Sequence, residues 1–413
     1  MIRRRTILAA GLGAPFVARA AGSARILIVG GGFGGTAAAR ALAAADPSMA
    51  VTLIERETAI STGPGSSAVI AGLRDAASIR FAIAPIQGVV RRPGEAIAVD
   101  PVARRVRLLD GAALEYDRLI LAPGVDIDWD GLPGYDRAAA EIMPHAWTGE
   151  AQTILLRNKL AAMPDGGTVV MSIPANPIRC PIAPYERASL IAWFLKAQKP
   201  RSKLLVLDAK ERFSNQTNFQ AAWATLYPGL LEWVGLPDGG RVTKIEAGIG
   251  RFETEFDDHR ADVGNVIPPQ RAGAIALAAG VADRTGWCPV NPATYESMLV
   301  PGIHVIGDAI IGGAMPKAAY AAGEHARACV AAIVASLRGA AFTPLRLENI
   351  CYGLAAPGYG FSVRGAYLPN GALLHEIDGT GKTSLPDAPA DVRVREAEDA
   401  DGWYRQITAA SFA

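Results

Sequence analysis

Cysteine and histidine are scarce in this 413-residue chain. It has four cysteines, Cys180, Cys288, Cys329 and Cys351, and five histidines. Four cysteines are too few for a disulfide scaffold, although they suffice for one working pair. Neither Cys-x-x-Cys nor His-Glu-x-x-His occurs in the sequence. We therefore expect no metal site.

The sequence also lacks an excess of one charge and a long apolar run. The formal net charge is +1, and no block of like charge suggests nucleic-acid binding. Residues 387–401 are acidic and polar. We expect no long amphipathic segment there and no stable membrane insertion. Half of the residues are hydrophobic and a fifth are charged, which is typical of a globular protein with two or three domains.

Residues 1–20 have the pattern of a twin-arginine signal peptide. Arg3, Arg4 and Arg5 precede a short apolar stretch at 6–17, and Ala18-Arg19-Ala20 fits a cleavage site. Cleavage near Ala20 would remove four arginines and change the net charge from +1 to +1 − 4 = −3. The predicted destination is the periplasm, where a disulfide can persist. The alternative is an uncleaved N-terminal segment.

The first motif with a chemical meaning is a glycine-rich turn after a predicted strand at 25–29. Gly30, Gly32 and Gly35 occupy the G-x-G-x-x-G positions, a helix is expected at 36–45, and a second strand at 51–54 ends at Glu55. This order is typical of dinucleotide binding, with the phosphates at the helix N-terminus and the acid on a ribose. The predicted contacts to the cofactor are Gly30, Gly32, Phe33, Gly34, Gly35, Glu55 and Arg56.

Two later stretches favour FAD as this dinucleotide. One is a strand within 116–124 that ends in a turn with Ala122 and Gly124. The other is a strand at 302–309 that ends in Gly307-Asp308. In FAD-binding folds of the disulfide-reductase type such stretches close over the cofactor, and we expect Asp308 to bind the ribityl chain. Pro316 and Lys317 precede a predicted helix at 318–337, whose N-terminus could face the flavin. His304 is interpreted as a core residue.

The middle of the chain repeats the strand-turn-helix order without glycines. A strand at 168–173, a helix at 188–196 and a strand at 204–207 give a second α/β unit, but its first turn begins with Pro174-Ala175-Asn176-Pro177. Prolines and Cβ atoms would hinder a pyrophosphate, so we predict no NAD(P) site. The turn carries Cys180, and Glu186 follows it. We interpret this as thiol chemistry in the place of hydride donation, with Cys288 or Cys329 open as partners of Cys180.

The predicted fold is α/β, with two Rossmann-like domains of the glutathione-reductase type and a small C-terminal α+β domain. The predicted segments are the signal peptide at 1–20, the FAD domain at 21–149 and 282–340, the second Rossmann-like domain at 150–281, and a flavin-covering domain at 341–413. The last segment is expected to consist of strands.

Over nearly its whole length the chain resembles the flavoprotein subunit of flavocytochrome c sulfide dehydrogenase. It is more distantly similar to sulfide:quinone oxidoreductases, and a flavoprotein of sulfur-oxidation (Sox) clusters is a close relative. The stretches that carry the resemblance are 30–35, 144–147, 179–188, 267–273, 286–290, 304–308, 315–317, 351–352 and 403–404.

The resemblance implies a redox-active disulfide between Cys180 and Cys351, with Glu186 as a nearby carboxylate and Trp403 beside the flavin. It implies that sulfide attacks the disulfide, that FAD takes two electrons, and that a c-type cytochrome subunit receives them. This chain has no Cys-x-x-Cys-His, so the haem would belong to the partner.

In one position the chain departs from the family pattern. Where the family often carries a cysteine that binds FAD covalently, this sequence has Gly63. We therefore predict non-covalent FAD. Two other interpretations are a Sox flavoprotein that acts on or binds a sulfur-carrier protein, and an NADH-dependent disulfide or ferredoxin reductase.

Overall fold

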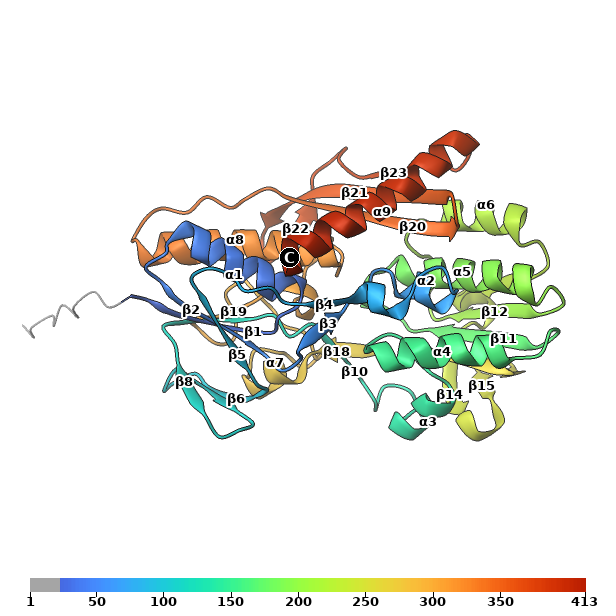
Figure 1. Cartoon of the computed structure of the whole chain (residues 1–413), viewed down its shortest axis with the longest axis horizontal. Coiled ribbons are helices and arrows are strands. Elements are labelled where there is room, and N and C mark those ends of the chain that lie inside the picture. The colour runs from blue at the N-terminus through green and yellow to red at the C-terminus, as the bar shows by residue number, and fades with distance from the viewer. Residues whose placement is uncertain (1–22) are drawn as a thin grey trace, which may run out of the picture.

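The structure, a computed structural model, describes residues 23–413. The predicted signal peptide at 1–20 lies outside the described residues. Two α/β lobes lie side by side along the long axis, and the C-terminal segment extends across both of them (Figure 1).

The first lobe is built on a five-stranded parallel sheet in the order β19-β9-β1-β2-β5. Its strands are β1 (Arg25–Val29), β2 (Ala50–Glu55), β5 (Val89–Pro93), β9 (Arg118–Leu121) and β19 (Ile303–Val305). The helices of this lobe are α1 (Phe33–Ala45), α7 (Ala274–Ala278) and α8 (Ala319–Leu337). Helices α1 and α8 pack against each other and cover one face of the sheet (Figure 1).

The register of this sheet places three turns next to one another. Val29 of β1 pairs with Leu121 of β9, and Leu121 pairs with Val305 of β19. Because parallel strands that pair in register end at one edge, the segments that follow all three strands lie at that edge. The motifs recognised separately in the sequence therefore meet in space.

The second lobe has a four-stranded parallel sheet in the order β13-β12-β11-β17. The strands are β11 (Thr168–Ile173), β12 (Lys203–Asp208), β13 (Leu231–Val234) and β17 (Val263–Val266), and the helices are α3 (Arg137–Ile142), α4 (Glu150–Ala162), α5 (Ala183–Gln198) and α6 (Gln216–Leu226). Helix α5 begins five residues earlier than expected, with Pro184 in its first turn, where proline is tolerated. Met171 and Val206 pair within a buried core.

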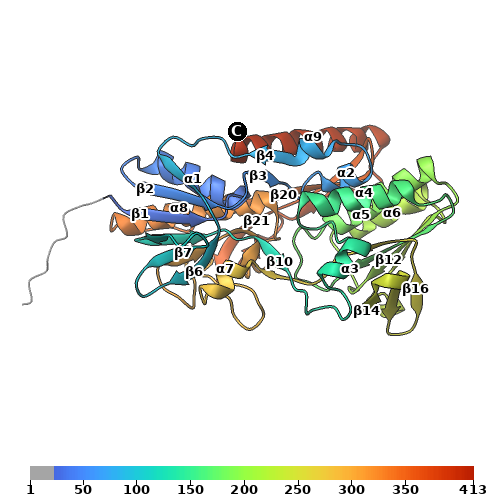
Figure 2. The same cartoon turned by 60° about the horizontal axis from the view of Figure 1, so that its bottom comes forward.

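Short antiparallel elements complete both lobes. The chain crosses between the lobes at β10 (Val125–Ile127), which is labelled between them in Figure 2, and crosses back at β18 (Gln270–Ala272). The two strands pair with each other. The other short strands are β3 (Ala59–Ser61), β4 (Arg80–Ala82), β6 (Ala96–Asp100), β7 (Arg105–Leu108), β8 (Ala113–Glu115), β14 (Val242–Glu246), β15 (Arg251–Thr254) and β16 (Asp258–Arg260). The short helical elements are α2 (Ser66–Ile70) and the 3-10 turns at Ala76–Ile79, Leu236–Asp238, Ala247–Ile249 and Gly307–Ala309.

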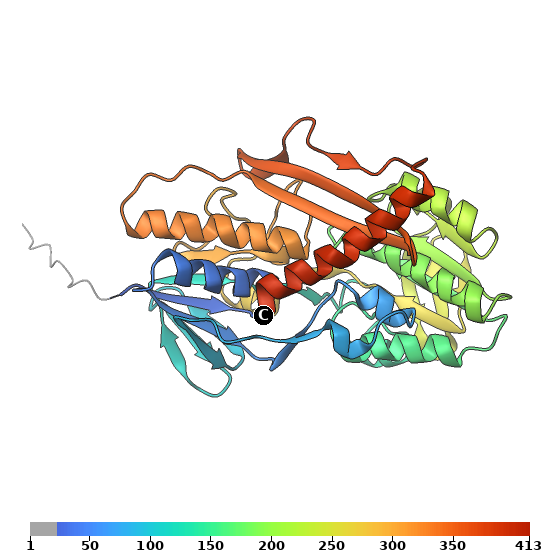
Figure 3. The ribbon, with the colours of Figure 1, turned by 45° about the horizontal axis from the view of Figure 1, so that its top comes forward.

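The C-terminal segment combines strands and a helix, which fits the predicted α+β class but not the expectation of strands alone. It contains β20 (Leu347–Ala356), β21 (Tyr359–Asn370), β22 (Leu373–Glu376) and β23 (Lys382–Thr383), and then the 23-residue helix α9 (Ala390–Phe412). Figure 3 shows α9 running diagonally over β20 and β21 toward α1. The expectation that this segment lacks a long helix with one buried face was wrong. Its acidic start is exposed, whereas Tyr404, Ile407 and Phe412 further along are buried against the first lobe.

Candidate active site

A cavity lies where the two lobes and the C-terminal segment meet. Eleven of the seventeen cofactor-binding or catalytic residues predicted from the sequence line it. They are Gly32, Phe33, Gly34, Ala122, Gly124, Cys180, Glu186, Gly307, Asp308, Cys351 and Trp403. The remaining predicted residues, Gly30, Gly35, Glu55, Arg56, Pro316 and Lys317, do not line it.

The glycine turn has the shape needed to hold a phosphate-bearing group. A Cβ on Gly35 would lie 1.8 Å from the carbonyl oxygen of Gly30, so only glycine permits this close packing of helix on strand. A Cβ on Gly32 would meet no atom within 4 Å, and this residue faces the cavity at the start of α1. The N-terminus of α1 offers free N–H groups and a positive dipole end to an anion.

Asp308 supplies an independent indication of a polyhydroxyl ligand. Its carboxyl group lines the cavity, and its Oδ1 atom is buried without a hydrogen-bond partner among the described residues. Burial raises the pKa of this carboxyl, although the nearby Arg179 and Lys317 lower it. A hydroxyl of a ribityl chain would satisfy such an oxygen. The residues present therefore fit FAD.

Glu55 and Arg56 lie outside the cavity wall. The Oε2 atom of Glu55 accepts a hydrogen bond of 2.5 Å from the N–H of Gly31, and its Oε1 accepts one of 2.7 Å from Glu57. Glu55 thus fixes the conformation of the glycine turn from behind. Arg56 is exposed and pairs with Glu57 and Glu95 at the surface.

Lys317 joins two segments of the site rather than facing the cavity. Its Nζ atom donates a hydrogen bond of 2.9 Å to the carbonyl oxygen of Asp308 and another to that of Ile310. The ammonium group lies 3.9 Å from the ring centroid of Trp287. The backbone carbonyl oxygen of Lys317 accepts a 2.6 Å hydrogen bond from the N–H of Cys180. The Asp308 turn and the Cys180 turn are therefore held together through one residue.

Cys180 has an unusual backbone conformation at the end of the turn that precedes α5. Its φ angle is +51°, a left-handed value that few non-glycine residues adopt. The carbonyl oxygen of Cys180 accepts a 2.9 Å hydrogen bond from Ala183, the first residue of α5. Backbone strain of this kind clusters at functional sites. The turn presents a half-buried thiol to the cavity.

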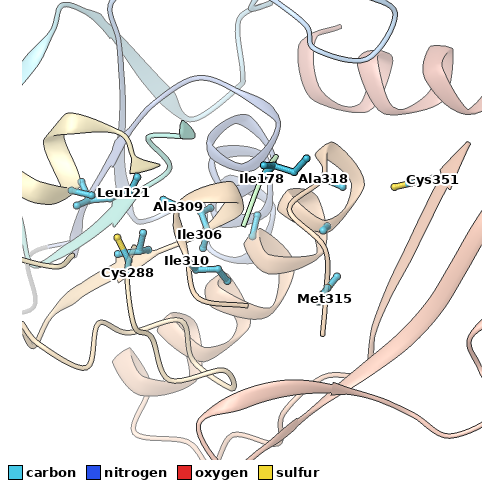
Figure 4. Packing of buried hydrophobic residues seen from close by; sticks show 14 of the residues in the cluster. Leu121, Ile178, Cys288, Ile306, Ala309, Ile310, Met315, Ala318 and Cys351 are labelled. Carbon is cyan, nitrogen blue, oxygen red and sulfur yellow. The ribbon is translucent and has the colours of Figure 1, made fainter. Parts of the chain in front are cut away.

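Cys351 reaches the same cavity from β20 in the C-terminal segment. It is 5% exposed and lines the cavity. Its electrostatic interaction with Cys180 raises the pKa of the Cys180 thiol. Cys351 and Cys180 are free thiols in this structure, as are Cys288 and Cys329, so the implied disulfide is not formed here. Cys288 packs beside Leu121 and Ile306, away from Cys351 (Figure 4).

The electrostatics of the thiol pair and its acid are dominated by burial. Burial raises the pKa of Cys180 far above its ordinary value and that of Cys351 to about 11. The Nδ2–H group of Asn349 approaches Sγ of Cys351 at 3.5 Å and opposes that rise. Burial also raises the pKa of Glu186 to about 7, against hydrogen bonds from Leu354 and Ser67. A carboxyl group with such a pKa can exchange protons near neutral pH.

Several cavity residues were not predicted from the sequence. They are Ile60, Ser61, Thr62, Gly63, Pro64, Gly65, Ser66, Ala68, Arg74, Trp147, Arg179, Ile182, Ala183, Arg187, Ile306, Ala318, Ala319, Ala322, Tyr352, Leu354, Ala397, Ala400, Asp401 and Tyr404. Gly63 had a sequence signal as the position of the family's covalent cysteine. Eight others, Trp147, Arg179, Ile182, Ala183, Arg187, Ile306, Tyr352 and Tyr404, lie in the stretches that carry the family resemblance, although no role was assigned to them. A Cβ on Gly63 would lie 3.5 Å from the guanidinium group of Arg179, which is ordinary contact.

The C-terminal helix contributes an aromatic wall to the cavity. The Tyr404 hydroxyl lies 2.9 Å from Oγ1 of Thr62, and the guanidinium group of Arg74 lies over the Tyr404 ring. The ring of Trp403 lies 6.0 Å from that of Tyr352. Through these contacts α9 completes the site. The resemblance implied Trp403 at this site, whereas the sequence gave no indication of the helix that carries it.

Comparison with known families agrees with this geometry. Residues 153–268 match the family "Sulfide dehydrogenase [flavocytochrome c] flavoprotein chain, central", and residues 343–412 match "Flavocytochrome c sulphide dehydrogenase, flavin-binding". A sulfide dehydrogenase flavoprotein chain from Chlorobaculum thiosulfatiphilum is 52% identical over 48 residues, which are 12% of this chain and 100% of that sequence. The chain belongs to the flavocytochrome c sulfide dehydrogenase flavoprotein family. It is accordingly an FAD-dependent oxidoreductase, as the resemblance implied.

The remaining matches place this family among wider relatives. Residues 24–154 match the pyridine nucleotide-disulphide oxidoreductases. The sulfide-quinone reductase of Aquifex aeolicus is 28% identical over 182 residues, 43% of this chain and 41% of that protein. Ferroptosis suppressor protein 1 of Taeniopygia guttata is 38% identical over 114 residues, 27% of this chain and 29% of that protein. The chain thus spans well under half the length of these two relatives.

Solved structures confirm the fold class. The sulfide:quinone oxidoreductase of Aquifex aeolicus superposes with a TM-score of 0.75 at 17% identity, over 94% of this chain and 92% of that one. Putidaredoxin reductase in its putidaredoxin complex gives a TM-score of 0.66 at 18% identity, over 94% and 99% of the two chains. Within residues 23–413, no helix is both long and apolar enough to cross a membrane, and no group of three or more potential ligands could hold a metal.

Proposed function

We propose that this protein oxidises sulfide by a thiol–disulfide step between Cys180 and Cys351, coupled to FAD. The observation that carries the proposal is that two cysteines from different segments line one cavity together with the glycine turn and Asp308. Family membership supports sulfide as the substrate class. In the oxidised protein the two sulfurs would form a disulfide.

The chain's own residues suggest which sulfur receives the substrate. Cys180 is the more exposed of the two, and Cys351 has the lower pKa because Asn349 donates toward its sulfur. A thiolate attacks the accessible sulfur and expels the more stable thiolate. Hydrosulfide would therefore attack Sγ of Cys180, break the S–S bond, form a persulfide on Cys180 and release the Cys351 thiolate.

Glu186 is the proposed proton acceptor in this step. The persulfide formed on Cys180 carries the proton of hydrosulfide, and Glu186, a carboxyl group with a pKa of about 7 beside the pair, can accept it. A second hydrosulfide would take the outer sulfur of the persulfide as hydrodisulfide and leave Cys180 as a thiol. FAD, when bound, would supply the two-electron acceptor for oxidation of the two thiols back to the disulfide.

Three further features of the proposal concern the whole assembly. We propose that FAD is held non-covalently, because Gly63 offers no sulfur at the cavity wall. We also propose export to the periplasm, which rests on the sequence of residues 1–20, and electron transfer to a c-type cytochrome subunit, which rests on the names of the matched family and relative. Denaturation in acid should release all flavin from the polypeptide; flavin that stays attached would contradict non-covalent binding.

An anaerobic titration of the oxidised holoprotein with sulfide tests the central proposal. Flavin absorbance at the visible maximum should bleach with a stoichiometry of two electrons per FAD. Rapid bleaching by NADH without sulfide would instead identify an NADH-dependent reductase. Bleaching only in the presence of a persulfidated carrier protein would identify the Sox-type alternative.

A further inference from the structure

Arg187 is a buried charge that forms no ion pair within residues 23–413. Only 2% of the residue is exposed, yet it lines the cavity. Its Nη1 atom donates to the carbonyl oxygen of His145 at 2.9 Å and its Nη2 to that of Ala146 at 2.5 Å. Nη1 also donates to Oδ1 of Asn265 at 3.3 Å, whereas the Nε–H is buried without a partner among the described residues.

A second arginine and a tryptophan stand beside it. The guanidinium groups of Arg179 and Arg187 lie 5.6 and 5.2 Å from the ring centroid of Trp147, and all three residues line the cavity. We call these three residues the arginine–tryptophan cluster. The Nε1–H of Trp147 is also buried without a partner. Gln270 accepts a hydrogen bond from the N–H of Arg179 at 2.9 Å, and its own Nε2 atom is buried and unpartnered.

These buried donors and charges lower the stability of the folded protein unless an anion is bound beside them. A buried N–H group without a partner costs about 1–3 kcal/mol, and unpaired buried charge costs more. The two guanidinium groups repel each other. Burial and the charge of Arg179 together lower the pKa of Arg187 to about 9. The acid next in sequence, Glu186, is itself driven toward its neutral form by burial. The protein therefore provides positive charge and N–H donors in excess of its own acceptors.

We propose that the arginine–tryptophan cluster binds the hydrosulfide anion beside the cysteine pair. The cavity otherwise disfavours anions, since both thiols and the acid are pushed toward neutrality. Hydrosulfide is small, monovalent and accepts hydrogen bonds, and guanidinium groups are weakly hydrated cations suited to buried anions. Arg179 immediately precedes Cys180 in the chain, so an anion held there lies next to the sulfur it attacks. This inference rests on the proposed function and adds to it the residues that select the ionised substrate.

Bromide is a suitable probe because it is a monovalent anion that cannot reduce a disulfide. The oxidised holoprotein is mixed with sulfide in a stopped-flow instrument at several bromide concentrations, with ionic strength held constant by gluconate. We expect bromide to raise the half-saturating sulfide concentration competitively and to leave the limiting rate of flavin bleaching unchanged. In the absence of sulfide, bromide should also perturb the visible flavin spectrum in a saturable way.

Two substitutions remove donors while keeping the local shape. Trp147→Phe keeps an aromatic ring under both arginines and loses the Nε1–H. Gln270→Glu keeps the acceptor for Arg179 and replaces the unpartnered donor. Trp147→Phe should raise the half-saturating sulfide concentration about tenfold and weaken bromide competition, which is the effect of losing one hydrogen bond to a charged group. Gln270→Glu should have an effect in the same direction, because it adds a negative charge that repels the anion. Trp193→Phe, a half-buried tryptophan of α5 outside the cavity wall, is the matched control and should change neither value.

The outcomes separate this inference from the function on which it rests. If sulfide does not bleach the wild-type flavin, the proposed function is wrong, whereas the saturable bromide effect on the spectrum still reports the anion site. If sulfide bleaches the flavin but bromide does not compete, and Trp147→Phe alters only the limiting rate, the cluster serves the flavin alone and the anion site is refuted.

Discussion

The two lobes use the same strand-turn-helix unit for opposite purposes. In the first lobe the turn after β1 is made of glycines, so the backbone can approach a ligand and the start of α1 is open to it. In the second lobe the turn after β11 contains prolines and ends in Cys180 with a φ angle of +51°. One turn offers bare N–H groups to phosphates, and the other offers a sulfur atom.

The acidic residues at the ends of the second strands also have different roles in the two lobes. Glu55 at the end of β2 supports the glycine turn through hydrogen bonds. Asp208, at the end of β12, is fully buried and accepts hydrogen bonds from Tyr185 at 2.7 Å and Lys210 at 2.6 Å. The ring of Phe213 stacks on Tyr185 at 3.6 Å. The acid that would bind a ribose in a nucleotide domain is here committed to the protein's own side chains. A fold can thus keep its topology while its ligand sites are filled.

The largest effect is expected from the addition of one methyl group to the glycine turn of the first lobe. We expect Gly35→Ala to abolish FAD binding and to yield little folded protein, because its Cβ would overlap the carbonyl oxygen of Gly30 at 1.8 Å. The measurement is flavin content after purification, with circular dichroism of the polypeptide. Gly323→Ala in α8, where a Cβ meets no atom within 4 Å, is the control and should retain full flavin. A flavin-loaded Gly35→Ala protein would contradict the role of this turn.

Replacing the sulfur in the other turn should remove the reaction and spare the cofactor. We expect Cys180→Ser to bind FAD normally and to lower the rate of flavin bleaching by sulfide at least about 10³-fold, because no disulfide can form. Stopped-flow absorbance measures the rate. Cys329→Ala is the matched control, since Cys329 is buried in α8 and does not line the cavity. Normal bleaching in Cys180→Ser would refute the thiol step.

Glu186 should impose a pH dependence on the second lobe's chemistry. Its raised pKa keeps the carboxyl protonated below about pH 7, so a base function is present above that pH and is lost as pH falls through it. The bleaching rate, divided by the fraction of sulfide present as hydrosulfide, should therefore rise through pH 7. Glu186→Gln should be about 10²-fold slower above pH 7 and should lack this rise. An unchanged profile in that variant would assign Glu186 to the helix N-terminus alone.

The smallest effect is expected from the filled nucleotide position. Tyr185→Phe removes one buried hydrogen bond to Asp208 and should lower the free energy of unfolding by about 1 kcal/mol, measured by urea denaturation. FAD content and bleaching by sulfide should stay as in the wild type. Tyr320→Phe, at a partly exposed position on α8, is the control and should lower the free energy of unfolding by less than Tyr185→Phe does. A gain of NADH-driven bleaching in Tyr185→Phe would show that this network is what excludes the nucleotide.

Much of the fold was predictable because its signals are local. The buried run at 25–29, the glycine spacing and the strand at 168–173 each identify an element from a few adjacent residues, and the structure has β1 and β11 at these positions. Helix α9 was missed because its first half is acidic and polar, and its buried face depends on residues of the first lobe that are far away in sequence.

The sequence by itself determined the glycine turn, the absence of glycines in the second turn, and the inventory of four cysteines. It left open which cysteine is near Cys180. It assigned no role to Arg179, Arg187 or Trp147, although they lie in the stretches that carry the family resemblance. Only the tertiary structure placed Cys351 in the cavity and Cys288 and Cys329 outside it. The physical reason is that these positions depend on where strands end, how two lobes meet and which charges become buried. Such properties arise from contacts between segments that are hundreds of residues apart, and no local pattern encodes them.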